Sequence, residues 1–70
     1  MRIRVSDPAL VGDLLEYLRR CGCEVMQTGR HIIAASYPHS FPYAAARLEL
    51  DLHLGDWRDK QADATAIVID

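Results

Sequence analysis

The stretch LELDLHL, residues 48–54, decides the fold, because its leucines alternate with polar residues as strictly as in a strand. The composition around it favours a helix. Ala44, Ala45 and Ala46 precede the stretch, and no β-branched residue occurs between positions 42 and 60. We therefore expect a helix over residues 43–58. A strand here would instead leave a sheet-rich α+β fold with one principal helix.

The N-terminal third predicts a strand and then a helix. Over residues 2–6, Ile3 and Val5 alternate with polar residues, which is the period of a half-buried strand. Asp7 can cap the following helix with its side-chain oxygen, Pro8 has the φ of a first helical residue, and Gly22 suits the left-handed position after the last turn. The expected apolar face of this helix contains Leu10, Val11, Leu14, Leu15, Leu18 and Cys21.

The remaining segments predict three more strands. Residues 23–26 lead into a turn at 27–30 and then into the β-prone run 31–37, which together indicate a hairpin that ends in a proline-containing loop. Residues 64–69 are apolar and β-branched, and we expect them to form a central strand. Two helices on one face of a four-stranded antiparallel sheet would satisfy every element. The chain is thus predicted to be one α+β domain, residues 1–70, of ferredoxin-like βαββαβ order.

The second predicted helix carries two apolar stripes. The first consists of Ala44, Ala45, Leu48 and Leu52, and the second of Ala46, Leu50, Leu54 and Trp57. A helix that lies on a sheet buries a face of limited width, so one stripe should need another partner. We expect Leu50, Leu54 and Trp57 to form a homo-oligomer interface, most simply that of a symmetric dimer, since Trp is enriched at interface hot spots. The alternative is a rotated helix that places this stripe in the core and exposes the alanine stripe.

Composition excludes several classes of protein. The 70 residues are 50% hydrophobic and 26% charged with a net charge of -2, which is typical of a globular domain and does not favour a nucleic-acid partner. No apolar run approaches the length of a membrane span, and the alternation after Met1 is unlike a signal peptide. We expect a cytoplasmic protein without a membrane or nucleic-acid partner.

Residues that could carry chemistry are few. Cys21 and Cys23 are separated by one glycine, a spacing too short for a zinc site or a stable disulfide, and His39 and Ser40 adjoin without an orienting acid. We therefore expect no metal, no cofactor and no catalytic residue. Tyr37 and His39 lie in the ring-rich loop that also contains Phe41 and Tyr43. This loop could form one wall of a small-molecule pocket, or simply cover the edge of the sheet and the start of the second helix.

Two resemblances bear on function. VSDPALVGDLL at residues 5–15, with GCEV at 22–25, resembles the opening of an ACT domain. The resemblance implies the βαββαβ order, pairing through helices or sheets, and amino-acid binding near the loop before the first helix, here at Asp7, Ala9 and Leu10. The whole chain is also similar to short uncharacterised actinobacterial proteins that begin like MRIRV and carry an ARLELDL run, which implies no function.

The leading hypothesis from the sequence is a small interaction module that is not an enzyme and that self-associates. The alternative is an ACT-like regulatory domain that binds an amino acid or a similar small ligand at Asp7, Ala9, Leu10, Tyr37 and His39.

Overall fold

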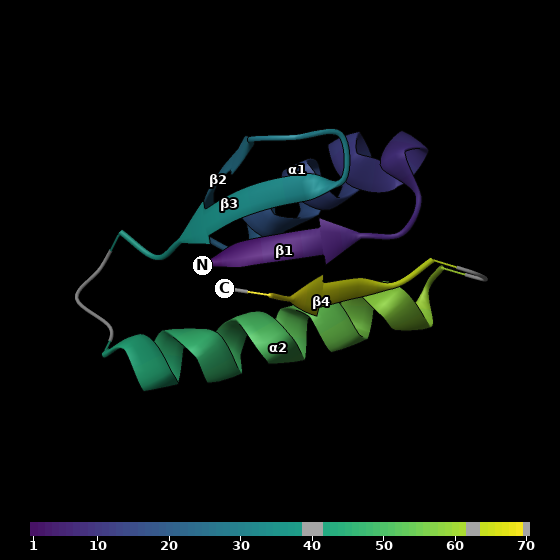
Figure 1. Ribbon diagram of the computed structural model, residues 1–70. Coiled ribbons are helices and arrows are strands. Elements are labelled where there is room, and N and C mark those ends of the chain that lie inside the picture. The colour runs from purple at the N-terminus through teal and green to yellow at the C-terminus, as the bar shows by residue number, and fades with distance from the viewer. Residues whose placement is uncertain (39–41, 62–63, 70) are drawn as a thin grey trace.

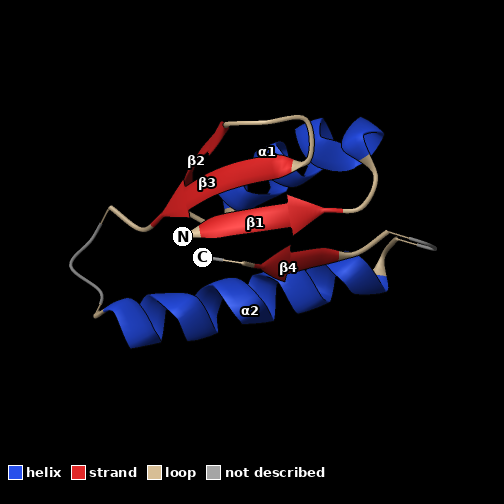
Figure 2. Cartoon of the chain, in the orientation of Figure 1, coloured by secondary structure: helices blue, strands red, loops and turns tan. Residues whose placement is uncertain are grey.

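The chain folds into a four-stranded antiparallel sheet and two helices, in the order β-α-β-β-α-β (Figures 1 and 2). The computed structural model describes residues 1–38, 42–61 and 64–69. Its elements are β1 (Arg2–Val5), the 3₁₀ turn η1 (Pro8–Leu10), α1 (Val11–Arg20), β2 (Glu24–Gln27), β3 (Ile32–Ser36), α2 (Tyr43–Asp59) and β4 (Ala66–Val68). The strand order is β2-β3-β1-β4. The predicted ferredoxin-like fold is confirmed.

The start and end of α1 follow from local sequence. The Asp7 side chain accepts a hydrogen bond from the Ala9 amide at 2.9 Å, and Pro8 opens a single 3₁₀ turn before the α-helix begins at Val11. Gly22 has a φ of 85°, a conformation that costs other residues about 1–2 kcal/mol. The chain can therefore reverse after α1 and enter β2.

The LELDLHL stretch is helical, as predicted, and lies in the middle of the 17-residue α2. Strong helix formers on both sides outweigh the alternation, because a strand would need β-branched residues that this segment lacks. The alternation nevertheless has a consequence. It distributes the leucines over two sides of the helix, so that Leu50 and Leu54 are buried while Leu48 and Leu52 are 66% and 67% exposed.

The predicted interface at Leu50, Leu54 and Trp57 is wrong, because all three side chains lie in the core of a single chain, with exposures of 0%, 1% and 2%. The alternative orientation of the helix is the one observed. Burying a Trp side chain removes about 150–250 Å² from water, worth about 4–6 kcal/mol, far more than burying alanines. The Trp57 indole N–H also donates to Asp13 Oδ2 on α1 at 2.8 Å. Area and hydrogen bonding thus select the same side of α2.

The position of β4 also differs from the prediction. It is an edge strand, paired with β1 alone, rather than a central one. Its apolar character reflects both of its sides: Ala66 is fully buried beneath the helices, whereas Ile67 is 49% exposed on the opposite face. An apolar run had suggested a strand covered on both faces, but here one face is uncovered.

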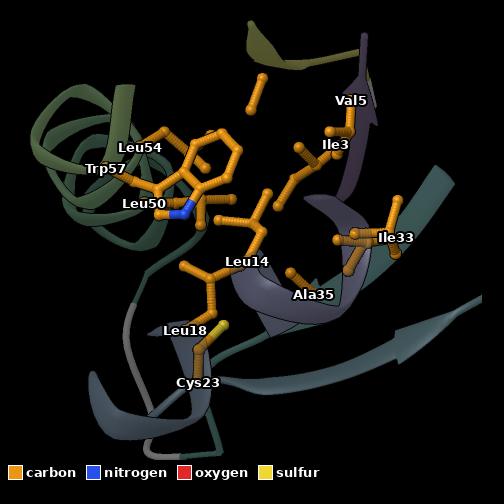
Figure 3. Packing of buried hydrophobic residues seen from close by; sticks show 12 residues of the cluster. Ile3, Val5, Leu14, Leu18, Cys23, Ile33, Ala35, Leu50, Leu54 and Trp57 are labelled. Atoms are coloured by element: carbon orange, nitrogen blue, oxygen red, sulfur yellow. The ribbon is translucent and has the colours of Figure 1, made fainter. Parts of the chain in front are cut away.

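The core lies between the sheet and the two helices, which cover the same face (Figure 3). Ile3 and Val5 of β1 and Ile33 and Ala35 of β3 point toward the helices. Leu14 of α1 lies among the side chains from α2 and the sheet and joins the three elements. The large side chains between the sheet and the helices all pack in this core, so a binding surface must lie on another face of the molecule.

Candidate interaction surface

The face of the sheet opposite the helices is uncovered in the described part of the chain. The strand alternation that buries Ile3 and Val5 places Arg2 and Arg4 on this opposite face. No described helix packs there, since both helices lie over the face formed by the buried residues (Figures 1 and 3). The strand register therefore determines which side chains meet on it.

Two rows of side chains cross this face. In one row Met26 pairs with Ala34 and Ala34 with Arg2. Beyond Arg2, the Ile69 amide donates to the Arg2 carbonyl at 2.9 Å and so continues the row past the end of β4. In this row Arg2 lies between the apolar residues Ala34 and Ile69.

In the second row Ile32 pairs with Arg4, and Arg4 with Ile67. The two arginines therefore form a short basic ridge along β1, with apolar side chains on the strands to either side.

We call this surface the open sheet face; it comprises Arg2, Arg4, Glu24, Met26, Ile32, Ala34, Ser36, Ile67 and Ile69. Three of its apolar side chains are strongly exposed: Met26 by 64%, Ile67 by 49% and Ile69 by 40%. Ile32 and Ala34 between them are partly buried. Scattered surface leucines are ordinary, but here apolar side chains from β2, β3 and the β4 segment flank the two arginines of β1 on one face. Apolar side chains gathered on one uncovered face are typical of an interaction site.

The open sheet face is hollowed at the end where β1 begins. A shallow depression of about 510 Å³ is lined there by Met1, Arg2, Glu24, Val25, Met26, Ala34, Ala35 and Ser36. It brings one basic and one acidic side chain to the same hollow, Arg2 from β1 and Glu24 from the edge strand β2. Within the described residues, the ion pairs are Arg20–Glu16 and His53–Glu49, and neither involves the charged groups of the open sheet face.

The residues predicted to bind a ligand do not form one site. Asp7, Ala9 and Leu10 follow the C-terminal end of β1, whereas Tyr37 follows β3, whose end lies beside the N-terminus of β1, as the Arg2–Ala34 pairing shows. The whole length of β1 therefore separates the two groups. His39 lies outside the described residues.

The loop before α1 uses its polar groups within the chain. Asp7 Oδ1 accepts from the Ala9 amide, and Ser6 Oγ accepts from the Thr65 amide at 2.8 Å. These bonds hold the loop and join the β1 end to the segment before β4. Both side-chain oxygens thus already accept hydrogen bonds within the chain.

Tyr37 and Cys23 pack with the core of the domain. Tyr37 packs against the core, and burial raises the pKa of its hydroxyl to about 12. The Cys23 thiol is buried and donates to the Ser36 carbonyl at 3.3 Å, and burial raises its pKa as well. A raised pKa keeps a thiol protonated and unreactive. No three His, Cys, Asp or Glu side chains of the described residues are grouped so that they could hold a metal ion.

A second exposed apolar strip runs along α2. It consists of Leu48 and Leu52 with the exposed Ala44 and Ala45. Acidic side chains surround it, with Asp51 and Asp56 exposed beside the leucines. This outer strip lies on one helix, whereas the open sheet face extends over four strands.

The sequence itself contains a signal for the open sheet face. A strand covered on one face should alternate, yet Ile32 and Ile33 are adjacent, and residues 67–69 are three consecutive β-branched apolar residues. Consecutive apolar residues on strands of a two-layer fold require apolar side chains on the uncovered face.

Neither helix of the described part has the length and apolar composition needed to span a bilayer. No family model, curated protein or solved structure matches the chain significantly.

Proposed function

We propose that the chain is a small interaction module that is not an enzyme and that self-associates through its open sheet face. The observation that carries the proposal is the exposure of Met26, Ile67 and Ile69 on the same uncovered face of the sheet. Removing such side chains from water is favourable by about 25 cal/mol per Å² of apolar area. A second copy of the chain presents the same apolar surface, so it is a partner that can cover these side chains.

The dimensions of the face predict a modest affinity. Four strands spaced about 4.8 Å apart and about four residues long give a footprint of roughly 300 Å². A standard stable interface buries about 800 Å² per partner. We therefore expect a reversible dimer with a Kd in the micromolar range or weaker, and its detection requires protein concentrations from about 1 µM to about 1 mM.

The experiment is sedimentation equilibrium over that concentration range on two matched double variants. Met26→Gln with Ile67→Gln removes two exposed apolar side chains from the open sheet face, and Leu48→Gln with Leu52→Gln removes two from the outer strip of α2. We expect the wild type and the α2 variant to dimerise and the sheet variant to remain a folded monomer. A wild type that is monomeric throughout, or a dimer lost only in the α2 variant, would contradict the proposal.

The second candidate is an ACT-like domain that binds an amino acid at the loop of Asp7, Ala9 and Leu10. Its support is the βαββαβ order together with the exposure of Asp7 and Ala9. A thermal-shift screen with the common amino acids tests it, since a ligand at 100 times its Kd adds about 2.7 kcal/mol of stability. A shift that Asp7→Ala abolishes would favour this candidate over self-association.

A further inference from the structure

We infer that the dimer is isologous, with β1 of each copy lying over β3 of the other and Arg2 of each copy paired with Glu24 of the second copy. This inference rests on the proposed function and specifies how the second copy binds. It follows from the positions of the charges on the open sheet face and from the pairing register of its strands.

The arginines disfavour the simplest stacking. If β1 lay over β1 of the second copy, Arg2 and Arg4 would face the same residues of the second copy across the interface. Like charges that face each other across an interface repel, and the repulsion grows once water is excluded. An offset of one strand leaves the Arg2 Cα atoms of the two copies about 11 Å apart at a sheet spacing of about 10 Å, so each Arg2 can turn away from its counterpart toward an acidic side chain. We therefore expect the two β1 strands to lie side by side, one strand apart.

A two-fold axis parallel to the strands, between β1 and β3, achieves this. The strand order β2-β3-β1-β4 then places β1 over β3 and β2 over β4 of the second copy. Positions along the strands are kept, so Arg2 lies over Ala34 and Arg4 lies over Ile32 of the second copy. Ala34 is small and leaves room for a guanidinium, while the stem of Arg4 can pack on Ile32.

The outer strands match in the same arrangement. Met26 pairs with Ala34, and Ile69 lies beside Arg2, so Met26 and Ile69 occupy the same row at opposite edges of the sheet. The axis brings Met26 over Ile69 of the second copy. In this row the apolar side chains at the two edges of the interface thus meet each other, which a purely basic or purely acidic partner would not provide.

Glu24 completes the pairing of charges. It lies on β2 opposite Ser36, one step along the strands from the row of Arg2. Sheets that pack face to face are about 10 Å apart, so Arg2 and Glu24 of the second copy have Cα atoms about 13 Å apart, within the combined reach of the two extended side chains. The symmetry makes this contact twice. The hollow that Arg2 and Glu24 line accommodates both side chains.

Charge reversal tests the arrangement. Arg2→Glu alone gives two glutamates per site and Glu24→Arg alone gives two arginines, so each homodimer should weaken by about tenfold or more. An equimolar mixture of the two variants restores both opposite-charge contacts, and its heterodimer should form about as tightly as the wild-type dimer. The double variant should also dimerise like wild type. Arg19→Glu, an exposed charge reversal on α1, is the control and should leave the Kd unchanged.

Two readouts separate the inference from the proposed function. Sedimentation equilibrium gives the Kd of each variant and mixture, and ¹⁵N-labelled Arg2→Glu protein titrated with unlabelled Glu24→Arg should show amide shift changes concentrated in the four strands. If the Met26/Ile67 variant loses the dimer but neither charge reversal alters the Kd, the Arg2–Glu24 arrangement is overturned and self-association through the open sheet face stands. A monomeric wild type overturns both.

Discussion

Leu52 and Leu54 are two residues apart on the same helix, yet Leu52 is 67% exposed and Leu54 is 1% exposed. Both belong to the alternating stretch that resembles a strand, and in composition nothing distinguishes them. They differ in the helical rows to which they belong. Leu54 continues a row with Leu50 and Trp57, and Trp57 reaches α1 through its bond to Asp13. On α2, the leucines that share a row with Trp57 are buried, and those of the other row are exposed.

The largest expected effect is the cost of shortening each leucine to alanine. Leu54→Ala should lower the free energy of unfolding by about 2–5 kcal/mol, because it leaves a cavity in a packed core. Leu52→Ala should change it by about 0.5 kcal/mol or less. Urea unfolding followed by the fluorescence of Trp57, the one tryptophan of the chain, measures both. Equal losses in the two variants would mean that α2 is rotated away from the orientation described.

The next test removes the hydrogen bond that joins the helices. Asp13→Ala leaves the buried Trp57 indole N–H without its partner, so we expect a loss of about 1–2 kcal/mol in the free energy of unfolding. Asp51→Ala on the exposed side of α2 is the matched control and should have little effect. Asp13→Asn keeps an acceptor and should recover most of the loss. A loss that is equal for Ala and Asn would assign the effect to charge instead of the hydrogen bond.

In the sheet, the adjacent residues Ile32 and Ile33 of β3 point to opposite faces. Ile33 is fully buried under the helices, whereas Ile32 lies on the open sheet face. Ile33→Val should cost about 0.5–1.5 kcal/mol, and Ile32→Val should cost close to nothing in the monomer. Denaturant unfolding at low protein concentration separates the two, because dimerisation would otherwise stabilise the folded chain. A larger loss in the free energy of unfolding for Ile32→Val than for Ile33→Val would mean that the core lies on the face that contains Ile32.

Sequence reasoning recovered the elements better than their surroundings. The helix at residues 43–58, the Asp7 cap and the Gly22 turn depend on local chemistry, and the structure confirms each. The side of α2 that is buried depends on which apolar stripe gains most by contact with the sheet and α1. Periodicity identifies such stripes but does not rank them.

The candidate surface was harder to predict for the same reason. The alternation of Arg2 and Arg4 with Ile3 and Val5 predicts that the arginines face away from the core, but their apolar neighbours come from three other strands. That neighbourhood exists only once the order and the register of the strands are known. The sequence does not single out Glu24, because its place in the candidate surface depends on the hollow that it lines together with Arg2.

The smallest expected effect concerns two tyrosines on either side of the loop that joins β3 to α2. Tyr37 packs on the core and its pKa is raised to about 12 by burial, whereas Tyr43 is 54% exposed. Between pH 10, where an unfolded tyrosine ionises, and pH 12 the unfolded chain releases a proton that the folded chain retains, so stability falls as the pH rises. Tyr37→Phe should therefore make the loss of stability above pH 10 shallower, and Tyr43→Phe should change it less. Burial also raises the pKa of Tyr17 and Cys23, which keeps a residual slope in both variants. Urea unfolding at a series of alkaline pH values measures the slope, and the same slope in Tyr37→Phe as in the wild type would contradict the burial of the Tyr37 ring.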